Sequence, residues 1–103
     1  MRLPKYKQPM LDIYNSTDFS GLTNEEKDCY DKVFFDSLKS PYCMVPADCI
    51  KEYKDRQNVI KALVDKGFVA HFCVENLLIP TIIAEVLNER RKEMQQRRSR
   101  RKA

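Results

Sequence analysis

The chain is poor in the residues and motifs from which enzyme active sites are usually built. It has a single histidine, His71, and two glycines among its 103 residues. Neither a glycine-rich phosphate loop nor a Ser-His-Asp or metal-carboxylate spacing can be read from the sequence. His71 lies in an apolar stretch with Phe72 and Val74, where a structural role is the default. We therefore expect a protein that is not an enzyme and has no cofactor.

Long hydrophobic runs are also missing. The longest run, residues 77–84, is far shorter than the roughly 20 apolar residues of a membrane-spanning helix. The first six residues lack the apolar core of a signal peptide. These absences predict a cytoplasmic protein without a membrane partner, and the length of 103 residues predicts one domain.

Four cysteines are present without a Cys-x-x-Cys pair: Cys29, Cys43, Cys49 and Cys73. The simplest interpretation is that they are small buried hydrophobic residues in a reducing compartment, with no metal bound. A zinc site of Cys43, Cys49, His71 and Cys73 is an alternative, although its spacings are unusual for tetrahedral zinc. Disulfides are a third interpretation, which requires an exported or hyperthermophilic protein.

The sequence is rich in basic charge at one end. Residues 88–103 hold eight of the 19 lysine and arginine residues and two acidic residues, so they carry +6. The whole chain carries +4, which leaves residues 1–87 at about −2. Such a run of like charge favours a polyanionic partner. Its basic residues are Arg90, Arg91, Lys92, Arg97, Arg98, Arg100, Arg101 and Lys102.

The first half of the chain predicts an irregular arm followed by a helix. Residues 1–21 are expected to be irregular, because Pro4 and Pro9 interrupt helices, and their apolar residues are expected to dock on the body. Residues 24–39 predict a helix that begins with a capping box of Thr23 and Glu26. Its predicted apolar face is Tyr30, Val33, Phe34, Ser37 and Leu38. Phe35 lies off this face and is expected to pack against the arm.

Residues 42–45 predict a short extended segment, and Pro46 fits the first position of a helix. The stretch that follows allows two interpretations. It is either one long helix, or a short helix at 46–50, a tight turn at 51–55 and a second helix at 56–66. Gly67 is a typical residue for the end of that helix.

β-branched and aromatic residues at 68–74 predict a strand, and a second strand at 77–79 would complete a hairpin. Pro80 is expected to open a last helix, in which Ile82, Ile83, Val86 and Leu87 form the apolar face. Beyond residue 87 all sides are charged, so the helix is expected to project into solvent and fray unless a partner orders it.

This order predicts a mainly α fold with a small β-hairpin: a winged helix-turn-helix domain at 22–87, followed by a C-terminal basic helix or tail at 88–103. Residues 56–69 resemble the recognition helix and wing of the winged-helix superfamily, where the pattern Val-Ile-x-x-Leu-x-x-x-Gly-Phe-Val is common. A more specific resemblance lies in Cys29–Val33, Pro41–Ala47 and Lys66–Val69. They are similar to the eukaryotic and archaeal small-subunit ribosomal protein family numbered twenty-five, over about residues 22–74. That resemblance implies a winged-helix fold that binds ribosomal RNA.

We expect a nucleic-acid-binding protein whose partner is ribosomal RNA or DNA. The predicted recognition helix offers Arg56, Gln57, Asn58 and Lys61 to bases or phosphates. Residues 55–66 carry only +1, so the basic tail is expected to supply most of the affinity as an anchor on phosphate. One alternative is a DNA-binding transcription or replication regulator of bacterial, phage or viral type. Another is a protein–protein adaptor or inhibitor in a larger assembly.

Overall fold

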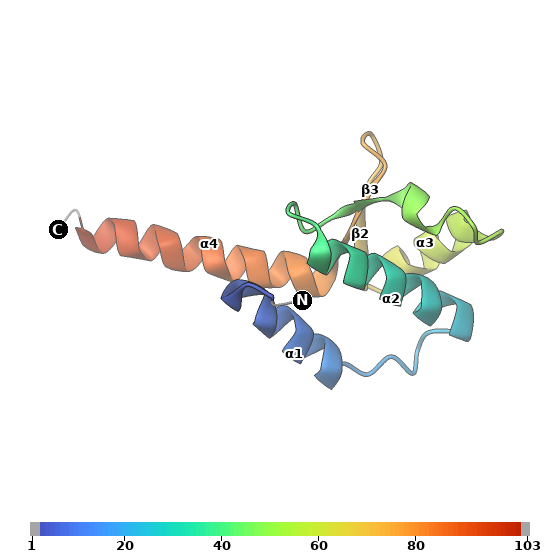
Figure 1. Ribbon diagram of the computed structural model, residues 1–103, viewed down its shortest axis with the longest axis horizontal. Helices are drawn as coiled ribbons and strands as arrows, with labels where there is room; N and C mark the ends of the chain where they lie inside the picture. The colour runs from blue at the N-terminus through green and yellow to red at the C-terminus, as the bar shows by residue number, and fades with distance from the viewer. Residues whose placement is uncertain (1–2, 102–103) are drawn as a thin grey trace.

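A computed structural model describes residues 3–101 of the chain and the side chains of residues 3–97. The molecule measures 55 × 31 × 27 Å. It is mainly helical with a small antiparallel sheet of three strands, in agreement with the predicted fold class (Figure 1). In chain order the elements are the 3-10 helix η1 (Lys5–Lys7), α1 (Gln8–Ser16), α2 (Asn24–Lys39), β1 (Val45–Pro46), the 3-10 helix η2 (Ala47–Ile50), α3 (Arg56–Asp65), β2 (Val69–Phe72), β3 (Leu77–Pro80) and α4 (Thr81–Arg101).

Helix α2 is the central element and confirms the predicted helix. The Thr23 hydroxyl accepts a hydrogen bond from the Glu26 amide at 3.1 Å, and the Glu26 carboxylate accepts one from the Thr23 amide at 3.0 Å. This capping box satisfies two amides that a helix start leaves without intrahelical partners. The predicted apolar face is confirmed, because Tyr30, Val33, Phe34, Ser37 and Leu38 are all buried.

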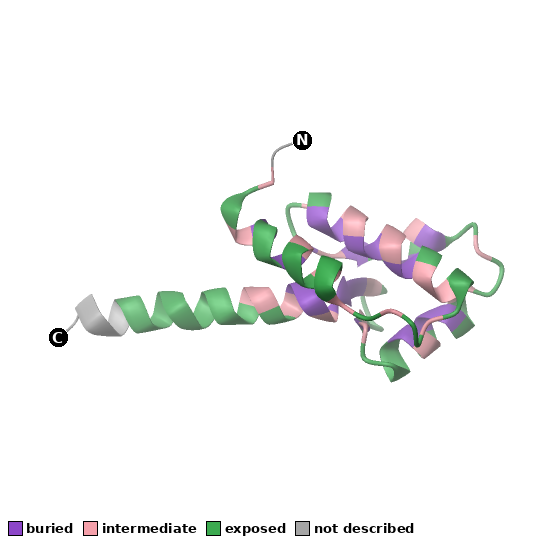
Figure 2. Cartoon of the chain, turned by 90° about the horizontal axis from the view of Figure 1, so that it is seen from below, coloured by how far each residue is buried: buried purple, intermediate pink, exposed green. Residues whose placement is uncertain are grey.

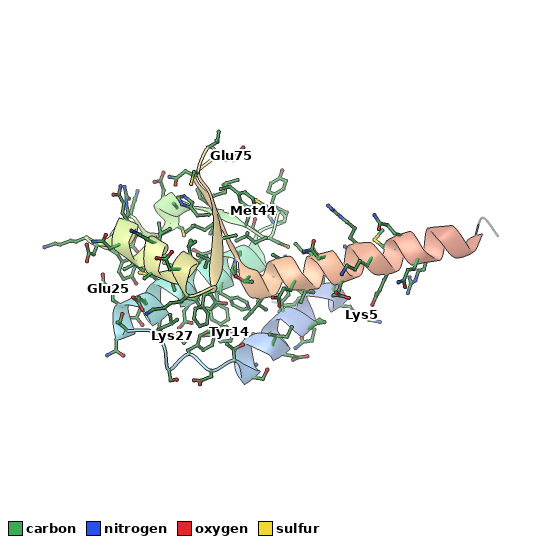
Figure 3. All side chains as sticks on the ribbon, turned by 180° about the vertical axis from the view of Figure 1, so that it is seen from behind. Lys5, Tyr14, Glu25, Lys27, Met44 and Glu75 are labelled. Carbon is green, nitrogen blue, oxygen red and sulfur yellow. The ribbon has the colours of Figure 1, made fainter. Side chains whose placement is uncertain are left out.

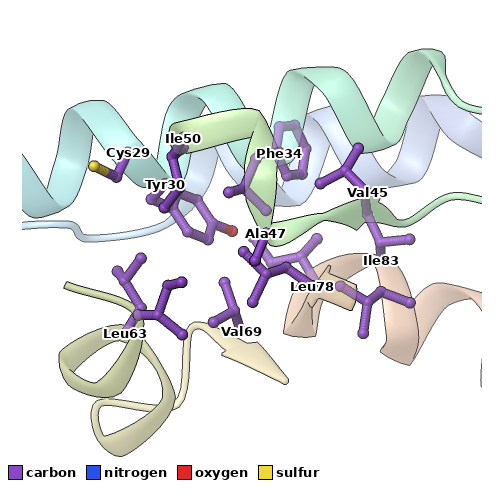
Figure 4. Packing of buried hydrophobic residues seen from close by; sticks show 14 of the residues in the cluster. Cys29, Tyr30, Phe34, Val45, Ala47, Ile50, Leu63, Val69, Leu78 and Ile83 are labelled. Carbon is purple, nitrogen blue, oxygen red and sulfur yellow. The ribbon is translucent and has the colours of Figure 1, made fainter. Parts of the chain in front are cut away.

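The core lies where α2, the sheet, α3 and the first turns of α4 meet (Figure 4). Phe34, Leu63, Leu78 and Ile83 contribute large side chains that are fully buried. They come from α2, α3, β3 and α4, respectively, so four elements contribute to the core. The first turns of α4 are therefore part of the domain, whereas the described side chains of its second half are exposed to solvent.

The sheet contains the predicted hairpin and one further strand. β3 pairs antiparallel with β2 on one side, with Phe72 opposite Leu77, and with β1 on the other, with Val45 opposite Leu78. The predicted helix start at Pro46 is displaced by one residue, because Pro46 pairs with Leu77 at the sheet edge and is the N-cap of η2, which begins at Ala47. Proline is tolerated at an edge, where its missing N–H is not needed by the sheet. Pro80 likewise ends β3, and α4 begins one residue later.

The predicted irregular arm at 1–21 is wrong for its middle part, where η1 and α1 form. Pro9 lies in the first turn of α1, and this turn tolerates proline because its amides have no intrahelical acceptor. Docking of the arm on the body is confirmed. Met10 is fully buried, and Tyr14 packs against Phe35 with their ring centroids 5.2 Å apart, as predicted for Phe35.

Of the two interpretations of residues 46–66, the one with two helices is confirmed. η2 is a single 3-10 turn, and α3 follows after a turn at 51–55. Gly67 has φ 84°, a conformation that favours glycine and ends α3 as predicted.

Helix α4 is continuous from Thr81 to Arg101, so the predicted boundary at residue 88 lies inside one helix. Ile82 and Ile83 are buried, and Val86 and Leu87 are half-buried against the core. Every residue from Asn88 to Arg97 is exposed (Figure 2). The predicted projection into solvent is thus confirmed.

Candidate nucleic-acid interface

Helix α3 places its polar residues on the side that faces away from the core. Val59, Ile60 and Leu63 are buried against α2 and the hairpin. Because these positions follow the helical repeat, the intervening residues face outwards. The predicted contact residues Gln57, Asn58 and Lys61 are exposed, and Arg56 is half-buried.

The structure brings three of these residues to a groove between α3 and the β2–β3 hairpin. The groove has a volume of about 400 Å³. Its lining comprises Ala47, Asp48, Arg56, Gln57, Ile60, Lys61, Val64, His71, Cys73 and Asn76. His71 Nε2 and Asn76 Oδ1 lie 2.9 Å apart, which joins the two sides of the hairpin loop. Asn76 was not among the predicted contact residues, because only the pairing of β2 with β3 brings residues 71 and 76 to the same groove.

Two further basic residues lie beside the start of α3. Lys51 and Lys54 line a shallow depression of about 440 Å³ together with Arg56, Gln57 and Asn58. They are exposed and belong to the turn between η2 and α3. Neither lysine was among the predicted contact residues, although the sequence places both within five residues of Arg56.

Several polar groups at α3 are already engaged. Asp55 Oδ1 accepts a hydrogen bond from Asn58 Nδ2 at 2.9 Å, which occupies the amide expected to contact a base. Lys66 Nζ lies 2.6 Å from Glu26 Oε1, and this ammonium lowers the pKa of the Glu26 carboxyl. Among the described side chains, Lys51, Lys54, Arg56 and Lys61 make no ion pair. Asp48 and Asp55 line the same surface, so part of this positive charge is opposed by nearby carboxylates.

The second half of α4 supplies the other basic surface. Arg90, Arg91, Lys92 and Arg97 are exposed. The Arg90 guanidinium stacks over the Tyr6 ring at 4.4 Å from its centroid, and Lys92 lies 3.5 Å from Glu89. The predicted contact residues Arg98, Arg100 and Arg101 lie outside the described side chains, and Lys102 lies outside the described residues.

The two basic surfaces are not adjacent. Helix α3 lies at one end of the long axis of the molecule and the free end of α4 at the other (Figure 1). The molecule is 55 Å long, so the two surfaces cannot converge on one cluster of phosphates.

The alternative zinc site is not assembled. Cys43 is buried and Cys73 is exposed at the hairpin, and no group of three or more His, Cys, Asp or Glu within the described part of the chain could hold a metal ion. Burial raises the pKa of the Cys29 and Cys49 thiols to about 11, which keeps them protonated at neutral pH.

No helix among the described residues is long and apolar enough to cross a membrane.

Comparison with known proteins adds no further constraint. The sequence matched no protein-family model and no curated protein, and the structure matched no solved structure.

Proposed function

We propose that this protein is a non-enzymatic nucleic-acid-binding protein with a winged helix-turn-helix fold. The fold is supported by the order α2, β1, η2, α3, β2, β3 and by the strand order β1-β3-β2. In this arrangement η2 and α3 form the helix-turn-helix, α3 takes the place of the recognition helix, and the β2–β3 hairpin takes the place of the wing.

The observation that carries the proposal is the exposure of basic side chains on two surfaces of a body that is otherwise slightly acidic. On the α3 surface, Lys51, Lys54 and Lys61 are exposed and Arg56 is half-buried. None of the four forms an ion pair with a described carboxylate, and they outnumber Asp48 and Asp55, which line the same surface. On α4 the basic residues are mostly arginine, whose planar fork suits phosphate oxygens. Cations that neutralise phosphates release counterions, which drives association.

The distance between the surfaces defines the length of the ligand. Duplex DNA advances 3.4 Å per base pair, so a ligand that touches both ends of a 55 Å molecule needs about 16 base pairs or an equivalent length of folded RNA. We expect shorter ligands to occupy one surface at a time. The α4 surface then acts as the anchor, and any selectivity resides at α3 and the adjoining groove.

Binding of the full chain to duplex DNA and to a structured RNA, measured by fluorescence anisotropy over a salt series, tests this proposal. One variant replaces Arg97, Arg98, Arg100 and Arg101 by Gln, and a second replaces Arg56 and Lys61 by Gln. A control variant replaces Lys39 by Gln, because Lys39 is exposed at the end of α2 and lies on neither basic surface. Each lost phosphate contact lowers the slope of log K against log salt by about 0.9 on duplex DNA.

We expect the α4 variant to show the largest loss of salt slope and the α3 variant to lose selectivity between ligands. The control should bind like the unchanged chain. A chain that ignores both nucleic acids at low salt disproves the proposal. Binding restricted to RNA supports ribosomal RNA as the partner, and sequence-selective binding to DNA supports the alternative of a DNA-binding regulator.

The hairpin favours a second candidate function, that of a protein–protein adaptor. Residues 68–80 contain no lysine or arginine and one acidic residue, Glu75, at the hairpin tip (Figure 3). Phe72 is 46% exposed and Val74 is 95% exposed, and exposed apolar residues suit a protein surface better than phosphate. A Val74→Lys variant distinguishes the two candidates. It should strengthen nucleic-acid binding if the hairpin lies against phosphates, and leave it unchanged if the hairpin faces a protein.

A further inference from the structure

A groove between α1 and α4 lies apart from the α3 surface. Its volume is about 740 Å³, and Tyr6, Pro9 and Ile13 line one side. The other side belongs to α4 and consists of Glu85, Val86, Asn88, Glu89, Arg90, Lys92 and Glu93. Ile13 remains 38% exposed in this groove. The groove therefore combines an apolar base with a rim of three carboxylates and two cations, of which Lys92 lies 3.5 Å from Glu89.

The carboxylates form a row along α4. Glu85, Glu89 and Glu93 follow one another at intervals of four residues, which places them on one side of the helix. Arg97 is the next residue of the same row. From residue 94 onwards the chain has five basic residues and no acidic one. This side of α4 is thus acidic in its first part and basic in its second.

We propose that this groove and the adjoining side of α4 bind a second copy of the chain, with the two α4 helices antiparallel. An antiparallel arrangement sets the basic part of one helix against the acidic part of the other. In the register that places Glu89 opposite Arg97 of the second copy, the two-fold axis passes near residue 93. The two-fold axis repeats this contact, so the dimer contains two Glu89–Arg97 pairs.

An exposed apolar side chain provides a second reason for the same occupant. Ile13 is 38% exposed in the groove, where a second copy would cover it. Residues 88–101 extend about 20 Å at 1.5 Å per residue. In the dimer each segment lies along the groove of the other copy, so surface is buried twice. Specific interfaces bury roughly 1,200 Å² or more in total.

The register also predicts one unfavourable contact. The Glu93 carboxylates of the two copies lie close to each other near the axis. The repulsion between these like charges opposes association. Replacing Glu93 by Gln removes this repulsion without removing the Glu89–Arg97 pairs. The proposal therefore predicts that one substitution in the row strengthens the dimer, while charge reversal at its neighbours weakens it.

Sedimentation equilibrium of the full chain without nucleic acid tests the proposal independently of the proposed function. We expect a monomer–dimer equilibrium that weakens as salt rises. Glu89→Arg and Arg97→Glu should each raise the dimer Kd by about tenfold, because each reversal acts at two symmetry-related pairs. The double variant E89R/R97E should restore the Kd to within about threefold. Glu93→Gln should lower it, and Lys61→Glu on the distant α3 surface should leave it unchanged.

Circular dichroism serves as the control for folding. Each variant is expected to keep its helices, because the substituted residues are exposed. A chain that stays monomeric up to about 1 mM overturns the proposal. So does a dimer that is indifferent to both charge reversals, or a double variant that is as weak as the single ones. A dimer weakened by Glu93→Gln overturns the antiparallel register.

Discussion

The ammonium of Lys7 is buried and donates hydrogen bonds to the carbonyl oxygens of Leu38, at 2.6 Å, and Ser40, at 3.1 Å. Leu38 lies in the last turn of α2, where carbonyls have no intrahelical donor. A cation at this position is also favoured by the helix dipole. Lys7 therefore ties the N-terminal segment to the end of α2, which is separated from it by 31 residues in the sequence.

Replacing Lys7 by Met should lower the free energy of unfolding by about 2 kcal/mol, because hydrogen bonds to a charged group are lost and buried carbonyls remain. Urea denaturation measures the change. Lys5→Met is the matched control, since Lys5 is exposed two residues earlier and should change stability by less than about 0.5 kcal/mol. Equal stability of the two variants would show that the Lys7 contacts contribute nothing.

Two tyrosines with nearly parallel rings are expected to respond in opposite ways to loss of their hydroxyls. Tyr14 Oη donates to Asp31 and accepts from Lys27 Nζ at 2.9 Å (Figure 3). Tyr30 Oη is buried and has no hydrogen-bond partner among the described residues. Tyr14→Phe should therefore destabilise the fold by about 1 kcal/mol, and Tyr30→Phe should be neutral or stabilising. Thermal unfolding of both variants checks this contrast, which fails if Tyr30→Phe is the more damaging of the two.

Stability should fall at alkaline pH. Burial raises the pKa of the Cys29 and Cys49 thiols from 9.0 to about 11, and it also raises the pKa of the Tyr30 hydroxyl. The unfolded chain therefore loses these protons first, and the stability that the two neutral thiols contribute is complete below pH 9 and lost as pH rises through about 11. Melting temperatures at pH 7 to about 11 measure the effect. A variant with Cys29→Ala and Cys49→Ala should show a shallower decline, and an equal decline would contradict this origin.

Only one thiol should react rapidly in the native protein. Cys73 is exposed, whereas Cys29 and Cys43 are buried and Cys49 is half-buried with a raised pKa. We expect a disulfide reagent such as DTNB to modify one thiol quickly at pH 7.5 and all four in denaturant. Cys73→Ser should abolish the fast phase. A fast phase that survives this substitution would show that the core opens on the time scale of the reaction.

Elements with strong local signals were predicted correctly. The Thr23–Glu26 capping box and the spacing of apolar residues in α2 act within a few residues, so they can be read from the sequence. The hairpin was recognised because its two apolar strands are close in the chain. Helix α1 contradicts the expectation that Pro9 interrupts a helix, because proline is tolerated in the first turn, where Pro9 lies.

The candidate site was predicted in part. The sequence placed Arg56, Gln57 and Lys61 on the outer side of α3, but Lys51, Lys54 and Asn76 join them only through the turn before α3 and the hairpin. Asn58 was predicted as a contact residue, and its hydrogen bond to Asp55 could not be anticipated without side-chain positions.

The linear order of charges and apolar residues was sufficient to establish a slightly acidic body and a basic end, since charge is a sum over the chain and requires no coordinates. The position of that basic end depends on packing. Ile82 and Ile83 anchor the start of α4 in the core, so the helix directs its basic half away from α3 to the opposite end of the molecule (Figure 1). The separation of the two basic surfaces, and the groove formed by α1 against α4, follow from contacts between residues that are distant in the sequence.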